Sequence, residues 1–548
     1  MAKQPKKNKG NNFLVQGSIL AIAGIVVRLI GLLYRVPLMN TIGEDGMGVY
    51  STAFSIYNIL LLISSYSLPL AVSRLVAARI SLGQYKNARR VFQGALMFAT
   101  ASGVIMCSIT WFGSNFFADL MKMPEAAYAI RVLAPCILIM AFLGVFRGYF
   151  QGHGTMVPTA TSQIAEQVFN AVVSVAAGYM LFKAGTERDL TEGTEGFYSA
   201  AYGASGGTLG TVTGAGIALL FFIVLYFSFR KVEDAKCRRD KHENRESYGY
   251  ILKIVIMTIL PVLFSTTIYQ ISSVLDQGIY AQSVSDSYAS VWGAYSSKYL
   301  LMIHVPTAIA SSMGSSIIPA LAAAISRGNK TEIIDKTGTA IRFNMVIAIP
   351  ASIGLAVLAG PIMNLLFSGD NSVAIHMMLI GSTRVMFNAL STISNSVLQG
   401  IGNIWIPVKN ALIALVLHIG ILAFMLWVLD LGIDGVVLSN VIFYIMMCVF
   451  NQLSIRHILQ YRQEYIKTFV CPLFSSAVMG LAASILYRVI HALIHSNMVS
   501  LLLSILVAVV VYAVLMLLTK GIDEVDLASF PKGRTLVAIA KKLHLLGR

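Results

Sequence analysis

The feature that most constrains the fold is a succession of apolar segments, each about 18 or more residues long, that recurs from residue 13 to residue 519. A segment of this length crosses a bilayer as a helix, because lipid offers no partner for unpaired backbone N–H and C=O groups. Charged residues make up only 12% of the chain, against about a quarter in soluble proteins. The sequence therefore predicts an all-α, polytopic membrane protein.

Length and apolarity predict about fourteen transmembrane helices. Their approximate limits are residues 13–39, 47–78, 91–113, 127–149, 156–182, 199–229, 249–279, 292–325, 339–365, 373–398, 405–429, 434–454, 468–491 and 498–519.

The distribution of basic residues predicts the orientation of these spans. If the N-terminus is cytoplasmic and the spans alternate, the predicted external loops contain only Lys122, Lys183 and Arg188 among the basic residues. The cytoplasmic segments hold the rest of the loop cations, including Arg147 after the fourth span. Both termini are then cytoplasmic. The net charge of +16 follows from this topology, so it does not indicate binding to nucleic acid.

Three short motifs recur at an offset of about 245 residues and predict an internal repeat. The stretches 48–51, 77–83 and 151–154 match 293–296, 322–328 and 399–402 in that order. Six spans separate equivalent positions, so the two repeats are parallel and flank a central cavity. The predicted parts are an N-terminal six-helix lobe (1–229), a cytoplasmic linker (230–248), a C-terminal six-helix lobe (249–454), two extra transmembrane helices (455–519) and a cytoplasmic basic tail (520–548), which forms an amphipathic helix or stays solvated.

The first span contains Arg28 and Arg35, which lie about two helical turns apart and so point the same way. A cation at the centre of a span costs about 2.5–3.5 kcal/mol on insertion scales, so it faces a cavity or a partner. The other deep cations are Lys298 and Arg384, and Arg74 is close to the inner headgroups. We expect these cations to bind an anion, or to form ion pairs or contacts with backbone carbonyls.

Only two acids lie deep in the spans, Glu166 and Asp276. They are either coupling-ion sites for H⁺ or Na⁺ or partners of the arginines. The sequence has no P-loop, no HExxH motif and no paired metal-ligand spacing, and its external loops are short. We therefore expect a transporter rather than an enzyme, with no cofactor or metal.

Several motifs resemble one family. They are Arg28-Leu29-Ile30-Gly31 in the first span, the run GSSIIPAL at 314–321 in the eighth, and QGxG after the fourth and tenth spans. With the repeat, they make the chain similar to the MurJ/Wzx flippases of the multidrug/oligosaccharidyl-lipid/polysaccharide exporter superfamily. Within it, the chain resembles the polysaccharide-biosynthesis proteins similar to stage V sporulation protein B and YtgP.

The resemblance implies a flippase of the bacterial plasma membrane. Its cargo would be an undecaprenyl-diphosphate-linked glycan, foremost lipid II, and its partners would include cell-wall synthesis proteins. Family contacts from the first, second and eighth spans would correspond to Arg28, Arg35, Arg74 and Lys298, with Arg384 as a further cation. A dianionic headgroup leaving an inside-negative cell gains about 4–5 kcal/mol at 100 mV, so the membrane potential is an expected driving force.

Two alternatives remain at this level. One is a flippase for another lipid-linked glycan, such as a capsule, teichuronic-acid or spore precursor. The other is a cation-coupled multidrug exporter, which would favour the opposite balance of deep charges.

Overall fold

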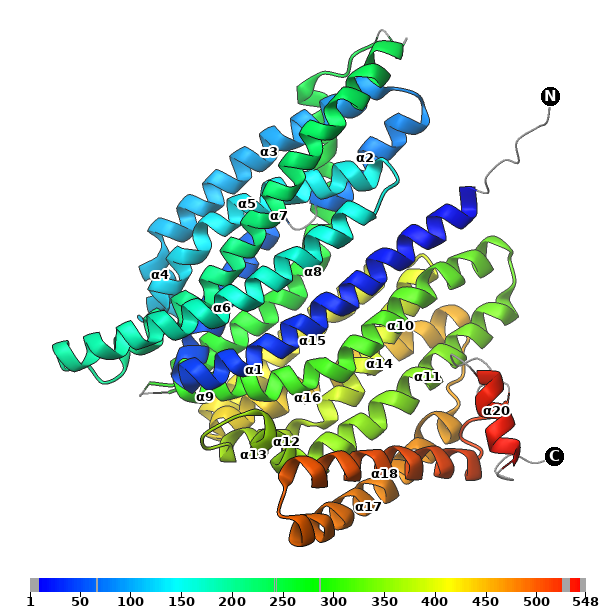
Figure 1. Ribbon diagram of the computed structural model, residues 1–548. Helices are drawn as coiled ribbons and strands as arrows, with labels where there is room; N and C mark the ends of the chain where they lie inside the picture. The colour runs from blue at the N-terminus through cyan, green and yellow to red at the C-terminus, as the bar shows by residue number, and fades with distance from the viewer. Residues whose placement is uncertain are drawn as a thin grey trace. The chain divides into compact units, whose positions relative to one another are not determined.

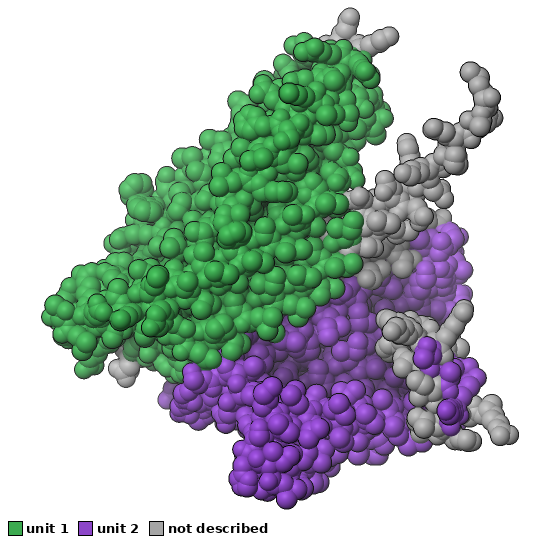
Figure 2. Space-filling model, viewed as in Figure 1, with its two compact units in different colours: residues 1–293 green, residues 294–548 purple. Residues whose placement is uncertain are grey.

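The computed structural model describes residues 9–65, 68–240, 242, 244–284, 287–524 and 533–542. These residues form helices joined by short connections, without a strand among them (Figure 1). The all-α prediction is confirmed. The chain forms two compact units, residues 1–293 and 294–548 (Figure 2).

The first unit consists of nine helices in the described part of the chain. They are α1 (Lys9–Ser64), α2 (Leu68–Ser81), α3 (Tyr85–Phe112), α4 (Ser114–Leu120), α5 (Ala126–Gly152), α6 (Val157–Glu192), α7 (Phe197–Arg239), α8 (Tyr248–Ser283) and α9 (Ala289–Gly293).

α1 joins the first two predicted spans through a break at one residue. Gly43 has φ 71° and ψ −178°, and the chain is helical on both sides of it. A residue with a Cβ adopts this backbone conformation only with strain, so glycine is required here. The second predicted span (47–78) is itself divided, because α1 ends at Ser64 and α2 begins at Leu68.

The packing of α6 against α7 depends on glycines that bring the two backbones together. A Cβ on Gly206 would lie 2.3 Å from the carbonyl oxygen of Ala177, and one on Gly210 would lie 2.1 Å from Ser174 Oγ. Neither position therefore accepts a larger residue without separating the helices.

Both helices are longer than a bilayer requires. With 36 and 43 residues they extend about 54 and 65 Å, against a hydrocarbon core of about 30 Å. The predicted external loop before residue 197 is therefore wrong, because α6 continues to Glu192. Likewise α7 continues to Arg239, so the first half of the predicted linker (230–248) is helical.

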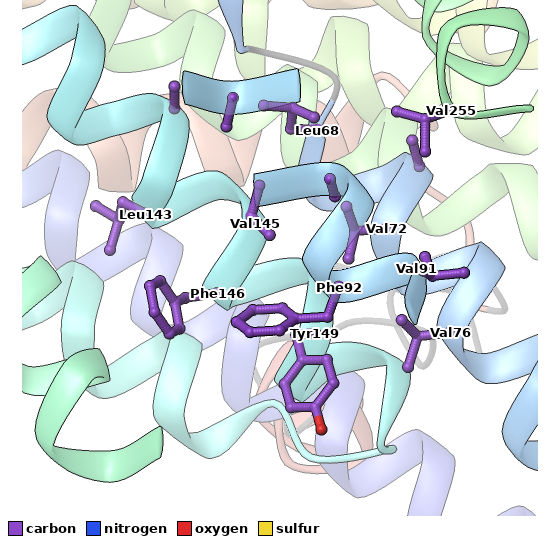
Figure 3. Close-up of a cluster of buried hydrophobic side chains, with 14 of the residues drawn as sticks. Leu68, Val72, Val76, Val91, Phe92, Leu143, Val145, Phe146, Tyr149 and Val255 are labelled. Carbon is purple, nitrogen blue, oxygen red and sulfur yellow. The ribbon is translucent and has the colours of Figure 1, made fainter. Parts of the chain in front are cut away.

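An aromatic and aliphatic core holds α2, α3 and α5 together. Figure 3 shows Phe92 of α3 between Phe146 and Tyr149 of α5, with Val72 of α2 nearby. The ring centroid of Phe92 lies 5.3 Å from that of Phe146 and 4.5 Å from that of Tyr149. Aromatic pairs at such distances add about 0.5–1.5 kcal/mol beyond their buried area, so this end of the unit is well fixed.

The glycines of the first pair of repeat motifs, Gly48 and Gly293, make matching contacts within this unit. A Cβ on Gly48 would lie 2.0 Å from the carbonyl oxygen of Ala289, and one on Gly293 would lie 1.9 Å from that of Glu44. Each motif glycine thus contacts the residue four positions before the other glycine. Such a reciprocal contact is what a two-fold relation between the two segments produces.

The second unit contains the remaining helices of the described chain. They are the π-helix η1 (Ala294–Tyr299), α10 (Leu300–Ser326), α11 (Lys330–Val357), α12 (Ala359–Leu366), α13 (Ser372–Gly381), α14 (Thr383–Gly400), α15 (Trp405–Trp427), α16 (Gly432–Leu459), the π-helix η2 (Ile466–Val470), α17 (Cys471–Ile494), α18 (Asn497–Leu518) and α20 (Gly533–Lys542). α13 and α14 meet at a bend of 50° and together correspond to the tenth predicted span.

The described residues contain ten helices long and apolar enough to cross a membrane, or eleven if the bent pair counts as one span. One of these ten, residues 22–81, covers two predicted spans. The multi-pass architecture is confirmed, and the count of fourteen stays a prediction. In the tail, residues 533–542 are helical, whereas residues 525–532 and 543–548 lie outside the described chain.

The boundary between the compact units, at Gly293, differs from the predicted lobe boundary at 230–248. α8 packs with α1 and α3 of the first unit, although the repeat pattern assigns it to the second lobe. The lobe boundaries from the repeat stay a prediction.

Candidate functional site

The predicted site residues are distributed over both units. The first unit carries Arg28 and Arg35 on α1, Arg74 on α2, Glu166 on α6 and Asp276 on α8, and the second carries Lys298 on η1 and Arg384 on α14. We describe each unit by itself.

Arg35 lies beside two tyrosines. Its guanidinium is within electrostatic range of Tyr34 and Tyr50, whose hydroxyls are 3.1 Å apart. No carboxylate of the described residues forms an ion pair with Arg35. Phenols donate and accept hydrogen bonds but do not neutralise a cation at ordinary pH, so the positive charge of Arg35 persists.

Arg28 is exposed on the same helix. Gly31 lies between the two arginines on their face of the helix, and a Cβ there would be 3.1 Å from Nε2 of Gln167 on α6. Because Gly31 has no side chain, the neutral amide of Gln167 lies close to the face of α1 that carries the two arginines.

Two further predicted residues of this unit, Arg74 and Asp276, differ in exposure. Arg74 is exposed on α2. Asp276 is buried on α8, with 3% of its surface exposed. The adjacent Gln277 is also buried and donates to Thr52 Oγ1.

Glu166 forms an ion pair with Arg147 of α5, with 2.6 Å between Oε2 and Nη2. Nε of Arg147 also donates to Ser162 Oγ at 3.3 Å. The charge pattern predicts that Arg147 lies in a cytoplasmic segment. That prediction is wrong, because Arg147 lies within α5 and is 8% exposed. Glu166 therefore neutralises Arg147, and does not pair with Arg28 or Arg35.

Lys298 is almost fully buried, at 1% exposure. The π-helix η1 widens the turn on which it lies; such bulges often occur at functional sites. Its Nζ donates to Asn371 Oδ1 at 2.7 Å and to the carbonyl of Asp370 at 3.2 Å. Phe367 contributes a ring 5.9 Å from Nζ.

The loop that holds Lys298 is itself fixed by hydrogen bonds. The backbone N–H and hydroxyl of Ser372 donate to the carboxylate of Asp370, each at 2.9 Å. These bonds, with a smaller contribution from Lys298, lower the pKa of Asp370 below its ordinary value of 3.8. The carboxylate therefore stays ionised and holds the turn before α13.

Arg384 is surrounded by tyrosine side chains. Nη1 donates to the hydroxyl of Tyr295 at 3.2 Å, and the guanidinium carbon is 5.3 Å from the ring centroid of Tyr444. Tyr299 stacks on Tyr295 and donates to the carbonyl of Gly381. Arg384 is 7% exposed and its Nε has no hydrogen-bond partner. Within the described chain, no carboxylate pairs with Arg384.

Residues of η1 take part in the surroundings of both predicted cations of the second unit. Lys298 extends from it to the loop at 370–371, and Tyr295 extends from it to Arg384. The Nε of Arg384 has no hydrogen-bond partner, and a guanidinium with an unused N–H donor is able to bind phosphate or carboxylate oxygens.

Sequence reasoning missed the tyrosines, Asn371 and the buried position of Arg147. A signal for two of the tyrosines was present, because Tyr50 and Tyr295 occupy the same place in the repeated G-x-Y-S motif. Each lies beside an arginine, Arg35 and Arg384 respectively. No comparable pattern indicates Asn371.

Comparisons with known proteins agree with this architecture. Residues 14–325 match the family model described as polysaccharide biosynthesis protein. The lipid II flippase MurJ of Bacillus subtilis (strain 168) is 21% identical over 87% of this chain and 89% of its own length. Stage V sporulation protein B of the same organism is 23% identical over 87% of this chain and 90% of its own.

Two solved structures share the fold. Lipid II flippase MurJ in an inward closed conformation has a TM-score of 0.64 at 17% identity, and the match covers 90% of this chain and 97% of that chain. An inward-facing multidrug resistance MATE family transporter of the MOP superfamily has a TM-score of 0.62 at 18% identity, covering 80% and 99%. The chain is a multi-pass membrane protein with the fold of these transporters, and it belongs to the polysaccharide biosynthesis protein family.

Proposed function

We propose that this protein is a flippase that moves an undecaprenyl-diphosphate-linked glycan, foremost lipid II, from the inner to the outer leaflet of the bacterial plasma membrane. Both termini would be cytoplasmic. Arg28, Arg35, Lys298 and Arg384 would bind the diphosphate during transit, and Arg74 would contact it near the inner headgroups.

The observation that carries the proposal is the environment of two deep arginines. Arg35 and Arg384 lie on apolar helices beside tyrosines, and in the described part of the chain neither is paired with a carboxylate. An uncompensated charge in a membrane segment is expensive and marks a path for ligand or ion. A guanidinium with free N–H groups fits the geometry of a phosphate.

The identity of the glycan is the finer part of the proposal. Lipid II is favoured because relatives named as lipid II flippases match most of the chain. Stage V sporulation protein B matches to a similar extent, so a flippase for another lipid-linked precursor is the second candidate. A cation-coupled drug exporter shares the fold but would favour acids where this chain has arginines.

The driving force is also part of the proposal. Outward movement of a dianion would be favoured by the membrane potential, by about 2.3 kcal/mol per charge at 100 mV. The two deep acids, Asp276 and Glu166, would be the candidate residues for coupling to H⁺ or Na⁺, and Glu166 is paired with Arg147. A transport rate that is unchanged when the potential is collapsed would contradict the first mechanism.

The test is depletion of the protein in its own host, followed by analysis of undecaprenyl-linked lipids on each leaflet. We expect lipid II to accumulate on the inner leaflet and to return to normal when the intact gene is restored. Accumulation of a different undecaprenyl-linked glycan would support the second candidate. Unchanged lipid pools, in a host shown to lack a second flippase, would contradict both.

A further inference from the structure

A cationic pocket lies at the end of the first unit that the charge pattern predicts to be cytoplasmic. Its volume is about 220 Å³, and its walls come from α3, α7 and the segment before α8. The lining residues are Lys86, Arg89, Arg90, Gln93, Cys237 and Arg245. Four of the six are cations and none is an acid.

The charges of this pocket are only partly neutralised. Arg89 pairs with Asp234 at 2.6 Å. Lys86 Nζ donates instead to the carbonyl of Asp240 at 2.9 Å, and Arg90 donates to the carbonyl of Glu246. Carbonyl oxygens orient a cation without cancelling its charge. Lys86, Arg90 and Arg245 therefore leave a surplus of positive charge, because none of them forms an ion pair with a described carboxylate.

The pocket is built by a segment that is fixed to α3. The carboxylate of Asp240 accepts the backbone N–H groups of Lys86 and His242. Asn87 donates to the carbonyl of Asn244 and accepts from the backbone N–H of Glu246. The same Glu246 pairs with Arg79 at 2.6 Å. The cations are thus held in place before any ligand arrives, which reduces the entropy lost on binding.

The surroundings place the pocket at the level of lipid headgroups. The Arg90 guanidinium lies 5.1 Å from the ring centroid of Tyr248, and Tyr248 and Tyr250 are exposed at the start of α8. Exposed tyrosines at the end of an apolar helix are typical of the membrane interface. Met97, about two turns further along α3, is already 55% exposed, as expected for a lipid-facing side chain.

We propose that this pocket binds the phosphate of an anionic phospholipid headgroup in the inner leaflet. The lipid would be a resident ligand of the first unit, separate from the transported glycan. Basic pockets between transmembrane helices on the cytoplasmic side are suited to such headgroups, and each basic residue near the surface contributes about 1 kcal/mol. This inference does not depend on the identity of the cargo.

Cys237 provides a reporter inside the pocket. Three other cysteines, Cys136, Cys448 and Cys471, are buried, and Cys107 is partly exposed. In the full chain carrying Cys107→Ser, the alkylation rate of Cys237 by N-ethylmaleimide can be followed by mass spectrometry. The rate is compared in dioleoyl-phosphatidylglycerol, in dioleoyl-phosphatidylcholine, and in phosphatidylcholine with added inorganic phosphate.

Two matched variants test the charge of the pocket. Gln93→Glu keeps the acceptor for the hydroxyl of Tyr248 and adds a negative charge at the pocket. The control is Gln463→Glu in the second unit, where the amide oxygen also accepts from a tyrosine hydroxyl, that of Tyr461. Rates are expressed as ratios within each variant, so a direct effect of the new charge on the thiol cancels.

We expect phosphatidylglycerol to slow alkylation about fivefold or more relative to phosphatidylcholine. Gln93→Glu should lose this protection, and Gln463→Glu should keep it. Equal protection by the two lipids, or full protection in Gln93→Glu, would overturn the proposal. If inorganic phosphate in phosphatidylcholine slowed the alkylation of Cys237 as much as phosphatidylglycerol does, the proposal would also be overturned, in favour of a soluble phosphate ligand.

Discussion

The buried arginines Arg147 and Arg384 show two ways to keep a guanidinium inside a membrane protein. Arg147 of the first unit is paired with Glu166 at 2.6 Å, whereas Arg384 of the second unit is surrounded by tyrosines. The two arginines are similarly buried, at 8% and 7% exposure. The first arrangement is neutral and supports the fold, and the second leaves a net charge available to an anion.

The largest effect should follow from breaking the neutral pair. Arg147→Gln leaves the partly buried Glu166 carboxylate without its cation, which should destabilise the protein by about 3 kcal/mol. The double variant Arg147→Gln/Glu166→Gln should recover most of this loss. Thermal unfolding in detergent measures both, and equal losses in the single and double variants would show that the pair is not coupled.

The tyrosine-lined arginine should affect transport more than stability. Arg384→Gln would remove the charge-assisted hydrogen bonds that we propose for the cargo, which corresponds to a decrease in translocation rate of about 10- to 100-fold. The thermal midpoint should change less than in Arg147→Gln, since no carboxylate is left unpaired. Lipid II translocation in reconstituted vesicles is the measurement, with the exposed Arg456→Gln as control. A normal rate in a folded Arg384→Gln protein would remove this residue from the site.

A smaller effect should come from the tyrosines themselves. Tyr295→Phe deletes the hydroxyl that accepts from Arg384 and should reduce the translocation rate by a few-fold, equivalent to about 1 kcal/mol. Tyr444→Phe keeps the ring face that contacts the guanidinium and should have less effect. The same assay ranks the two variants, and the reverse order would contradict the assigned contacts.

The smallest effect concerns the loop that holds Lys298. Because the pKa of Asp370 is lowered in the folded protein by its bonds from Ser372, its stabilising contribution is fully present above the ordinary pKa of 3.8. The contribution is lost as pH falls through the lower folded-state value. The stability difference between the wild type and Asp370→Ala should therefore shrink at pH values below about 4. A difference that is constant with pH would indicate that the bonds do not depend on ionisation.

The sequence predicted the fold class and most helices, because spans follow from apolar length and bilayer thickness alone. It predicted a loop before residue 197 and a linker after residue 229 that are partly helical, since helices that extend beyond the bilayer turn polar and resemble loops in composition. The break at Gly43 lies in the predicted connection between the first two spans, at residues 40–46, but the sequence does not show that the conformation of a single residue makes it.

The candidate site was only partly predictable. The positions of Arg35 and Arg384 within apolar segments followed from the sequence, because a charge in such a segment is conspicuous. Except for Tyr34, which adjoins Arg35, their tyrosine partners are distant in sequence, and all of them are ordinary residues of a membrane helix. Arg147 was assigned to a loop because it lies near the end of an apolar run, and only the packing of α5 against α6 reveals that it is buried beside Glu166.

The most direct measurement is the affinity of the intact protein for undecaprenyl diphosphate and for undecaprenol, determined by native mass spectrometry. If Arg35 and Arg384 receive a diphosphate, the wild type should prefer undecaprenyl diphosphate, and Arg35→Gln/Arg384→Gln should lose most of this preference. Arg147→Gln/Glu166→Gln, which also removes a buried guanidinium, should keep it. Equal affinity of the Arg35→Gln/Arg384→Gln protein for the two lipids would support the claim, and a preference equal to that of the wild type would contradict it.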